Sequence, residues 1–73
     1  MFYTANDQLP AALRALLPSR AQDTYRGAFN DAYAAFAGDA DRERRAHLIA
    51  WAAVKRSYIK QGEHWTQRQS PIS

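Results

Sequence analysis

The chain has 73 residues, with ten Lys and Arg, seven Asp and Glu, no cysteine and a formal net charge of +3. This length allows one domain with one small core, and the lack of cysteine excludes disulfides and thiolate metal sites. No apolar run reaches the roughly 18 residues of a membrane-spanning helix, and no secretory signal pattern opens the chain. We therefore expect a soluble, cytoplasmic protein.

The charges are divided unevenly between the two halves of the sequence. Residues 1–41 hold three basic and five acidic side chains, whereas residues 42–73 hold seven basic and two acidic ones. The second half therefore favours an acidic protein surface, an anionic membrane face or nucleic acid as a partner. A helix rich in arginine is also often no more than a solvated surface.

The first predicted helix covers residues 8–17. Asn6 and Asp7 precede it as candidate N-caps, and Pro10 falls in its first turn, where a missing N–H has no cost. Pro18 ends it, because the residue before a proline is driven out of the helical region. Its apolar side chains form one stripe at helical spacing: Leu9, Leu13, Leu16 and Leu17.

The second predicted helix begins at Ser19. Ser19 and Gln22 have the spacing of a capping box, in which each side chain bonds the backbone N–H of the other residue. Gly38 is the expected C-cap, and a short polar turn follows it, so the next helix should return antiparallel to this one. The apolar stripe of the helix comprises Ala21, Tyr25, Ala28, Phe29, Ala32 and Phe36.

The third predicted helix covers residues 42–60, with Gly62 just beyond its end. Its apolar arc is wide, as expected for the central helix of a three-helix array. We predict a core face made of His47, Trp51, Val54 and Tyr58, with Leu48, Ala52 and Ile59 on an adjoining side and Ala50 on the other flank.

The two ends of the chain carry aromatic residues that a disordered tail would leave exposed. Phe2 and Tyr3 lie near the start, and Trp65 lies in a short segment of extended character. Pairing of these two segments would cover the rings. We therefore predict an all-α fold, a compact three-helix domain over residues 1–66 with a small two-stranded pairing of the N- and C-terminal segments. Residues 67–73 should form a flexible tail.

One charge feature of the third helix has a defined geometry. Arg42, Arg45, Arg56 and Lys60 fall on one side of the helical wheel and form a basic stripe. The stripe is either a solvated face or a surface that binds an anionic partner. We take these four residues as the candidate partner-binding site.

Catalytic and cofactor chemistry find no support in the sequence. Ser19 is assigned to a helix cap, and Ser57 has no carboxylate four residues away on either side. His47 and His64 are not joined by any cluster of potential metal ligands. The three glycines are scattered rather than gathered in a phosphate-binding loop. We expect no enzyme activity, no cofactor, no metal and no small-molecule substrate.

Several short blocks follow one another along most of the chain. The first half holds Leu9-Pro10, Leu17-Pro18-Ser19, Ala21-Gln22-Asp23, Tyr25, Ala28-Phe29-Asn30 and Ala32. The second half holds His47, Ala50-Trp51-Ala52-Ala53-Val54-Lys55, Tyr58, Lys60 and Trp65. The order of these blocks resembles that of the ChaB family, whose members show LP, LPxxAQ and AFN signatures.

The resemblance implies a mainly helical fold with a small strand pairing near the termini. Family members are named as regulators of a cation/proton antiporter, which implies contact with a membrane cation transporter. We expect a monomeric protein that regulates such a partner by binding it. The alternative is a nucleic-acid-binding accessory protein that uses the basic stripe. The sequence departs from the family in the link at Gly38 to Asp41, where a longer charged insertion is common.

Overall fold

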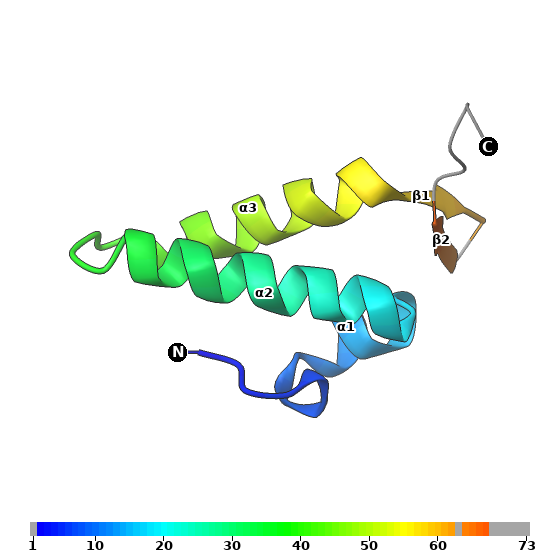
Figure 1. Cartoon of the computed structure of the whole chain (residues 1–73), viewed down its shortest axis with the longest axis horizontal. Helices are drawn as coiled ribbons and strands as arrows, with labels where there is room; N and C mark the ends of the chain where they lie inside the picture. The colour runs from blue at the N-terminus through cyan, green and yellow to red at the C-terminus, as the bar shows by residue number, and fades with distance from the viewer. Residues whose placement is uncertain (1, 63, 68–73) are drawn as a thin grey trace.

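Two long antiparallel helices, α2 (Ser19–Ala35) and α3 (Arg42–Ser57), form the body of the molecule (Figure 1). The structure is a computed structural model that describes residues 2–62 and 64–67. A 3₁₀ turn (Asn6–Gln8) and the short helix α1 (Ala11–Leu16) precede α2, and the strands β1 (Tyr58–Gln61) and β2 (His64–Gln67) follow α3. The prediction of three helices with one small two-stranded sheet is confirmed.

Two prolines set the length of α1. Pro10 has an extended ψ of 143°, so α1 begins one residue later, and Leu17, before Pro18, is extended with φ −107° and ψ 135°. The predicted helix over residues 8–17 was therefore too long, because its first part is the 3₁₀ turn. Three leucines of its stripe are buried, while Leu16 is exposed.

The capping box predicted at the start of α2 is wrong. No side-chain hydrogen bond caps this helix, whose N-cap is Pro18. Instead, Gln22 Nε2 donates to the carbonyl oxygens of Leu17 at 2.8 Å and Arg14 at 3.3 Å. These oxygens lie at the C-terminal end of α1, where no further turn of the helix supplies N–H groups for them to accept hydrogen bonds from. Gln22 thus fastens the end of α1 to the first turn of α2.

The core lies along the contact between α2 and α3. The predicted stripe of α2 is confirmed, since Ala21, Tyr25, Phe29 and Ala32 are buried and Ala28 and Phe36 pack against them. The remaining buried side chains come from the first leucine-rich segment and from α3 with its following strand: Leu9, Leu13, Leu17, Ala46, Ala50, Val54 and Tyr58.

The buried face of α3 is rotated from the predicted one. Ala46 and Ala50 are fully buried with Val54, whereas Trp51 is only partly buried and His47 is exposed. Small side chains let two helices approach closely, so the alanine row faces α2 and the larger rings lie at its flank. The opposite face of α3 is exposed, so α3 is not the central helix of an array.

The C-terminal segment folds as a hairpin of its own. The helix α3 ends at Ser57 rather than Lys60, and β1 pairs antiparallel with β2 in the register Tyr58↔Gln67 to Gln61↔His64. Gly62, which begins the turn, has a φ of +64° that glycine adopts without strain. The predicted pairing of the N- and C-terminal segments is wrong, because this local hairpin supplies the partner of the Trp65 segment.

The N-terminal segment is held by α2 instead. The Asn30 side chain accepts from the Tyr3 N–H at 2.9 Å and donates to the Tyr3 carbonyl at 2.7 Å, as a neighbouring strand would. Arg26 Nε donates to Asn6 Oδ1 at 2.8 Å. One amide side chain on a helix therefore takes the place of the predicted partner strand. The predicted tail from residue 68 onward lies outside the described residues, and Gln67 belongs to β2.

The alanine row of α3 provides the first test. Ala50→Leu should lower the free energy of unfolding by about 1–3 kcal/mol, because a larger side chain would force α2 and α3 apart. Ala52→Leu, on the exposed side of the same helix, should change it by no more than about 0.5 kcal/mol. Urea denaturation followed by circular dichroism measures both. Equal effects would contradict the placement of the buried face.

The two hydrogen bonds between the Asn30 side chain and the Tyr3 backbone provide the second test. Asn30→Ala should cost about 1–3 kcal/mol, since it removes two hydrogen bonds and leaves partly buried backbone groups without their partner. The exposed neighbour Asp31 is the control, and Asp31→Ala should change stability by no more than about 0.5 kcal/mol. Hydrogen exchange at the Tyr3 amide should also accelerate in Asn30→Ala alone. An unchanged exchange rate would show that the contact does not hold the segment.

Candidate functional site

The structure separates the four basic residues of the predicted stripe. Arg42, Arg45 and Arg56 lie on α3, whereas Lys60 lies in β1 because the helix ends before it. The four side chains therefore do not form one continuous helical face. Their role in partner binding remains a prediction, and each must be judged from its own contacts.

Arg42 is engaged by α2. Its guanidinium carbon lies 3.6 Å from the centroid of the Tyr33 ring, and its Nε donates to the Tyr33 carbonyl oxygen at 2.6 Å. The centroid of the Phe2 ring lies 5.9 Å from the same carbon. A planar guanidinium is well suited to stack on an aromatic ring while it donates a hydrogen bond. Arg42 thus helps to join α2, α3 and the N-terminal segment.

Two further arginines in the first turn of α3 are paired with aspartates of the preceding link. Arg45 Nε lies 2.9 Å from Asp39 Oδ2, and Arg44 Nη2 lies 3.6 Å from Asp41 Oδ2. These pairs are largely exposed, so each adds little to stability. They reduce the net positive charge at this end of the helix.

The last turn of α3 is different. Arg56 is exposed, and no ion pair joins it to any other residue that the structure describes. Lys55, next to it, is exposed as well. Arg56 therefore places a positive charge without an ion-pair partner among the described residues at the C-terminal end of the helix.

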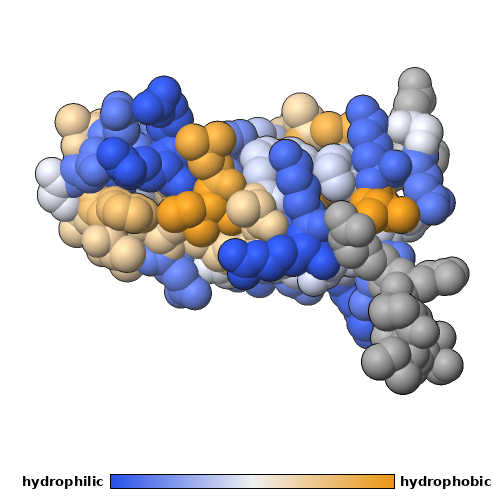
Figure 2. Space-filling model, turned by 90° about the horizontal axis from the view of Figure 1, so that it is seen from above, coloured by the Kyte–Doolittle hydropathy of each residue, from blue (hydrophilic) through white to orange (hydrophobic). Residues whose placement is uncertain are grey.

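Between the two groups of cations lies an apolar patch. Leu48 is 60% exposed and Ile49 is 42% exposed, with the exposed methyl group of Ala52 one turn after Leu48. Figure 2, which looks onto the α3 side of the molecule, shows apolar surface between strongly hydrophilic side chains. We call this surface the α3 outer face and define it by Arg44, Arg45, Leu48, Ile49, Ala52, Lys55 and Arg56.

Sequence reasoning placed Leu48 and Ala52 beside the core and missed their exposure. The signal that identifies the buried side is the spacing of Ala46, Ala50 and Val54, which recur every four residues. Leu48 and Ala52 lie opposite this row on an ideal wheel. Because leucine is the more hydrophobic residue, the pattern of hydrophobicity alone favours the wrong side.

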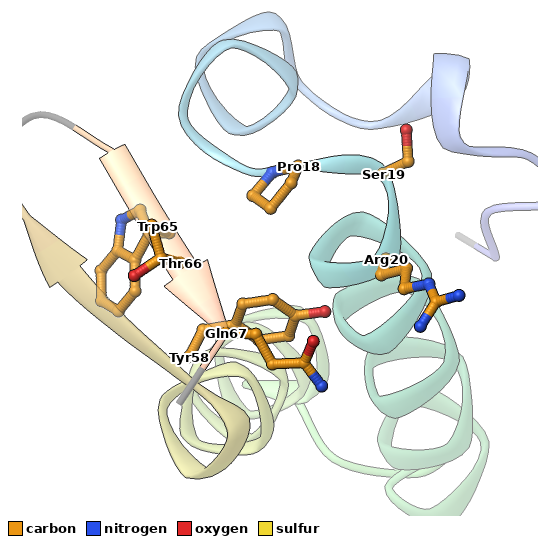
Figure 3. Close-up of a pocket in the computed structure, with 7 residues that line it drawn as sticks. All are labelled: Pro18, Ser19, Arg20, Tyr58, Trp65, Thr66 and Gln67. Carbon is orange, nitrogen blue, oxygen red and sulfur yellow. The ribbon is translucent and has the colours of Figure 1, made fainter. Parts of the chain in front are cut away.

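A second surface feature is a shallow hollow of about 400 Å³ at the end of the molecule where the hairpin meets α2 (Figure 3). It is mainly apolar and open to solvent. Its lining comes from two places in the sequence: Pro18, Ser19 and Arg20 at the start of α2, and Tyr58, Trp65, Thr66 and Gln67 in the hairpin. Sequence reasoning did not predict it, because the two segments meet only through the tertiary fold.

A cluster of rings connects the core to this end. The Tyr25 hydroxyl and His47 Nδ1 are hydrogen bonded, and the Trp51 ring lies between those of Tyr25 and Trp65, at 5.8 and 5.5 Å between centroids. Burial, with a smaller contribution from Tyr3, raises the pKa of the Tyr25 phenol well above its ordinary value. The phenol is therefore neutral at physiological pH. The contacts of His47 suit a structural role.

The described residues do not assemble a metal site. No group of three His, Cys, Asp or Glu side chains among them could hold an ion. Within the same residues, no helix combines the length and apolar character that crossing a membrane requires. The surface features to be explained are therefore the α3 outer face and the hollow.

The raised pKa of Tyr25 makes stability depend on pH in the alkaline range. Above a pH of about 10, the unfolded chain loses the phenol proton while the folded chain retains it, so the folded state becomes less favoured. The stability advantage of wild type over Tyr25→Phe should fall by roughly 1.4 kcal/mol between pH 9 and pH 11. Urea titrations at each pH measure it. A constant difference would contradict the burial of the phenol.

Three comparisons with known proteins agree. The ChaB family model matches residues 9–68. Proteins named "Putative cation transport regulator ChaB" from Escherichia coli K12 and Shigella flexneri are 44% identical over 66 residues, covering 82% of this chain and 87% of theirs. The NMR solution structure of a protein with the same name has a TM-score of 0.79 and 39% identity, covering 92% of this chain and 99% of that one. The chain belongs to the ChaB family.

Proposed function

We propose that this protein regulates cation transport by binding a partner protein through the α3 outer face. The carrying observation is the exposure of Leu48 and Ile49 on the same face as Arg56, which has no ion pair with the other described residues. The printed names of the relatives supply the biological setting, since they are described as cation transport regulators.

The apolar centre supports a protein partner. A large exposed leucine has a cost in water that burial in an interface removes, and interfaces gain most of their affinity from a few buried anchors inside a polar rim. Leu48 and Ile49 would be the anchors. Arg56 on the rim would attract an acidic patch on the partner and set its orientation.

Nucleic acid is the second candidate, because the α3 outer face is basic. It receives less support from the contacts on this face. Phosphate binding requires available cations, yet Arg44 and Arg45 are paired with Asp41 and Asp39. Arg42 is stacked on Tyr33, so its guanidinium is already engaged within the fold.

The four residues of the basic stripe accordingly have different proposed roles. Arg56 is assigned to the contact with the partner, and Arg45, whose charge is paired with Asp39, lies on the same face. Arg42 supports that contact by holding the start of α3 against α2. Lys60 lies in β1 of the hairpin and not on the helix that carries Leu48.

The test uses a photo-crosslinking amino acid at Ala52 in the native host. We expect a covalent adduct with one membrane transport protein, identified by mass spectrometry. The double variant Leu48→Asp, Arg56→Glu should reduce the adduct roughly tenfold, which corresponds to a loss of about 1.4 kcal/mol in binding. Circular dichroism should show the double variant folded, because both side chains are exposed.

The control carries the same crosslinking residue at Ala12, an exposed position on α1. This position should not form the adduct. If Ala12 and Ala52 give the same adducts, or if Ala52 gives none, the proposal is wrong. An adduct with nucleic acid, together with binding that weakens steeply as salt rises, would favour the second candidate.

A further inference from the structure

Among the described residues, no further strand pairs with the outer edge of β2. The sheet contains two strands, so β2 is bonded to β1 on one side alone. An antiparallel pair uses alternate residues for its mutual hydrogen bonds, and the other backbone groups of β2 therefore point away from β1. Among the described residues, no backbone hydrogen bond outside the hairpin involves β2.

This free edge borders the hollow. Figure 3 shows β2 between β1 and Pro18, with the start of α2 on the far side. A third strand laid along β2 would therefore occupy the hollow. Its side chains would alternate between the apolar lining, which includes Trp65 and Tyr58, and the solvent. Unsatisfied backbone groups and an adjacent apolar pocket are the two requirements for binding by strand addition.

Two cationic residues lie at or beside the hollow. Arg20 lines it, and no acidic residue is among the described residues that do so. Lys60 is the cross-strand partner of Trp65, so the two side chains share one face of the hairpin. Neither Arg20 nor Lys60 forms an ion pair with another residue in the described part of the chain. An occupant with acidic side chains would therefore complement the site.

We propose that the free edge of β2 binds an extended acidic segment of a partner protein, which adds a third strand and places alternate apolar side chains in the hollow. This site is separate from the α3 outer face. The proposal rests on the unpaired strand edge, the apolar hollow beside it and the positive charges of Arg20 and Lys60.

The probe is a capped six-residue peptide of alternating glutamate and leucine, titrated into the full chain labelled with nitrogen-15. Amide chemical shifts should change at Trp65, Gln67, Ser19 and Arg20. A peptide with lysine in place of glutamate should bind at least about fivefold more weakly, and so should a peptide methylated on alternate backbone nitrogens. Arg20→Glu should weaken binding of the original peptide by at least about fivefold.

Arg56→Glu is the control, because Arg56 belongs to the α3 outer face. It should leave the affinity for the peptide within about twofold, while Arg20→Glu should leave the adduct formed from Ala52 intact. Loss of one readout with retention of the other therefore separates a failure of this proposal from a failure of the proposed function.

Several results would overturn the proposal. These are the absence of shifts at millimolar peptide, shifts confined to α3, and equal binding of the methylated peptide. If the β2 amide shifts depend on protein concentration without peptide, a second copy of the chain occupies the edge and the proposal is wrong. If the peptide binds to the Ile72→Asp variant but not to the wild type, the last residues of this chain compete with the peptide for the hollow. That result would also overturn the proposal.

Discussion

Close packing of α3 against α2 through small side chains is the constraint on which the rest of the structure depends. Ala46 and Ala50 are fully buried, and their size lets the two helices approach until the rings of Tyr25 and Phe29 fill the space between them. A domain this short buries little surface when it folds, so its stability depends on close packing between these two helices. The close approach leaves no room for Trp51 in the middle and directs its ring to the flank.

Aromatic contacts then link the N-terminal segment to the hairpin through the core. Aromatic rings form a continuous series of neighbours from the N-terminal segment to the hairpin, with centroids 5.1 to 6.1 Å apart. Each contact adds a small stabilisation beyond the area that it buries. The members of the series, in order, are Phe2, Tyr33, Phe29, Tyr25, Trp51 and Trp65.

The same packing determines which groups face the solvent. With the alanine row turned inward, Leu48 and Ile49 are turned outward between the cations of α3. Aromatic contacts between Trp51 and Trp65 hold the hairpin over the end of the helices, which creates the hollow beside β2. The two surfaces that we propose for binding are thus consequences of one helix contact, although they lie on different elements.

The sequence by itself determined the features that depend on local periodicity and on proline. The buried stripe of α2, the break at Leu17 and Pro18, and the mainly helical fold follow from spacing and backbone restriction, which act within a few residues. Tertiary structure alone decided which side of α3 is buried, because its wide apolar arc is compatible with more than one side. It also decided that Asn30 holds Tyr3, that Arg42 stacks on Tyr33, and that the hollow forms. These contacts join residues on different elements, and no local pattern of the sequence determines how those elements are placed in space.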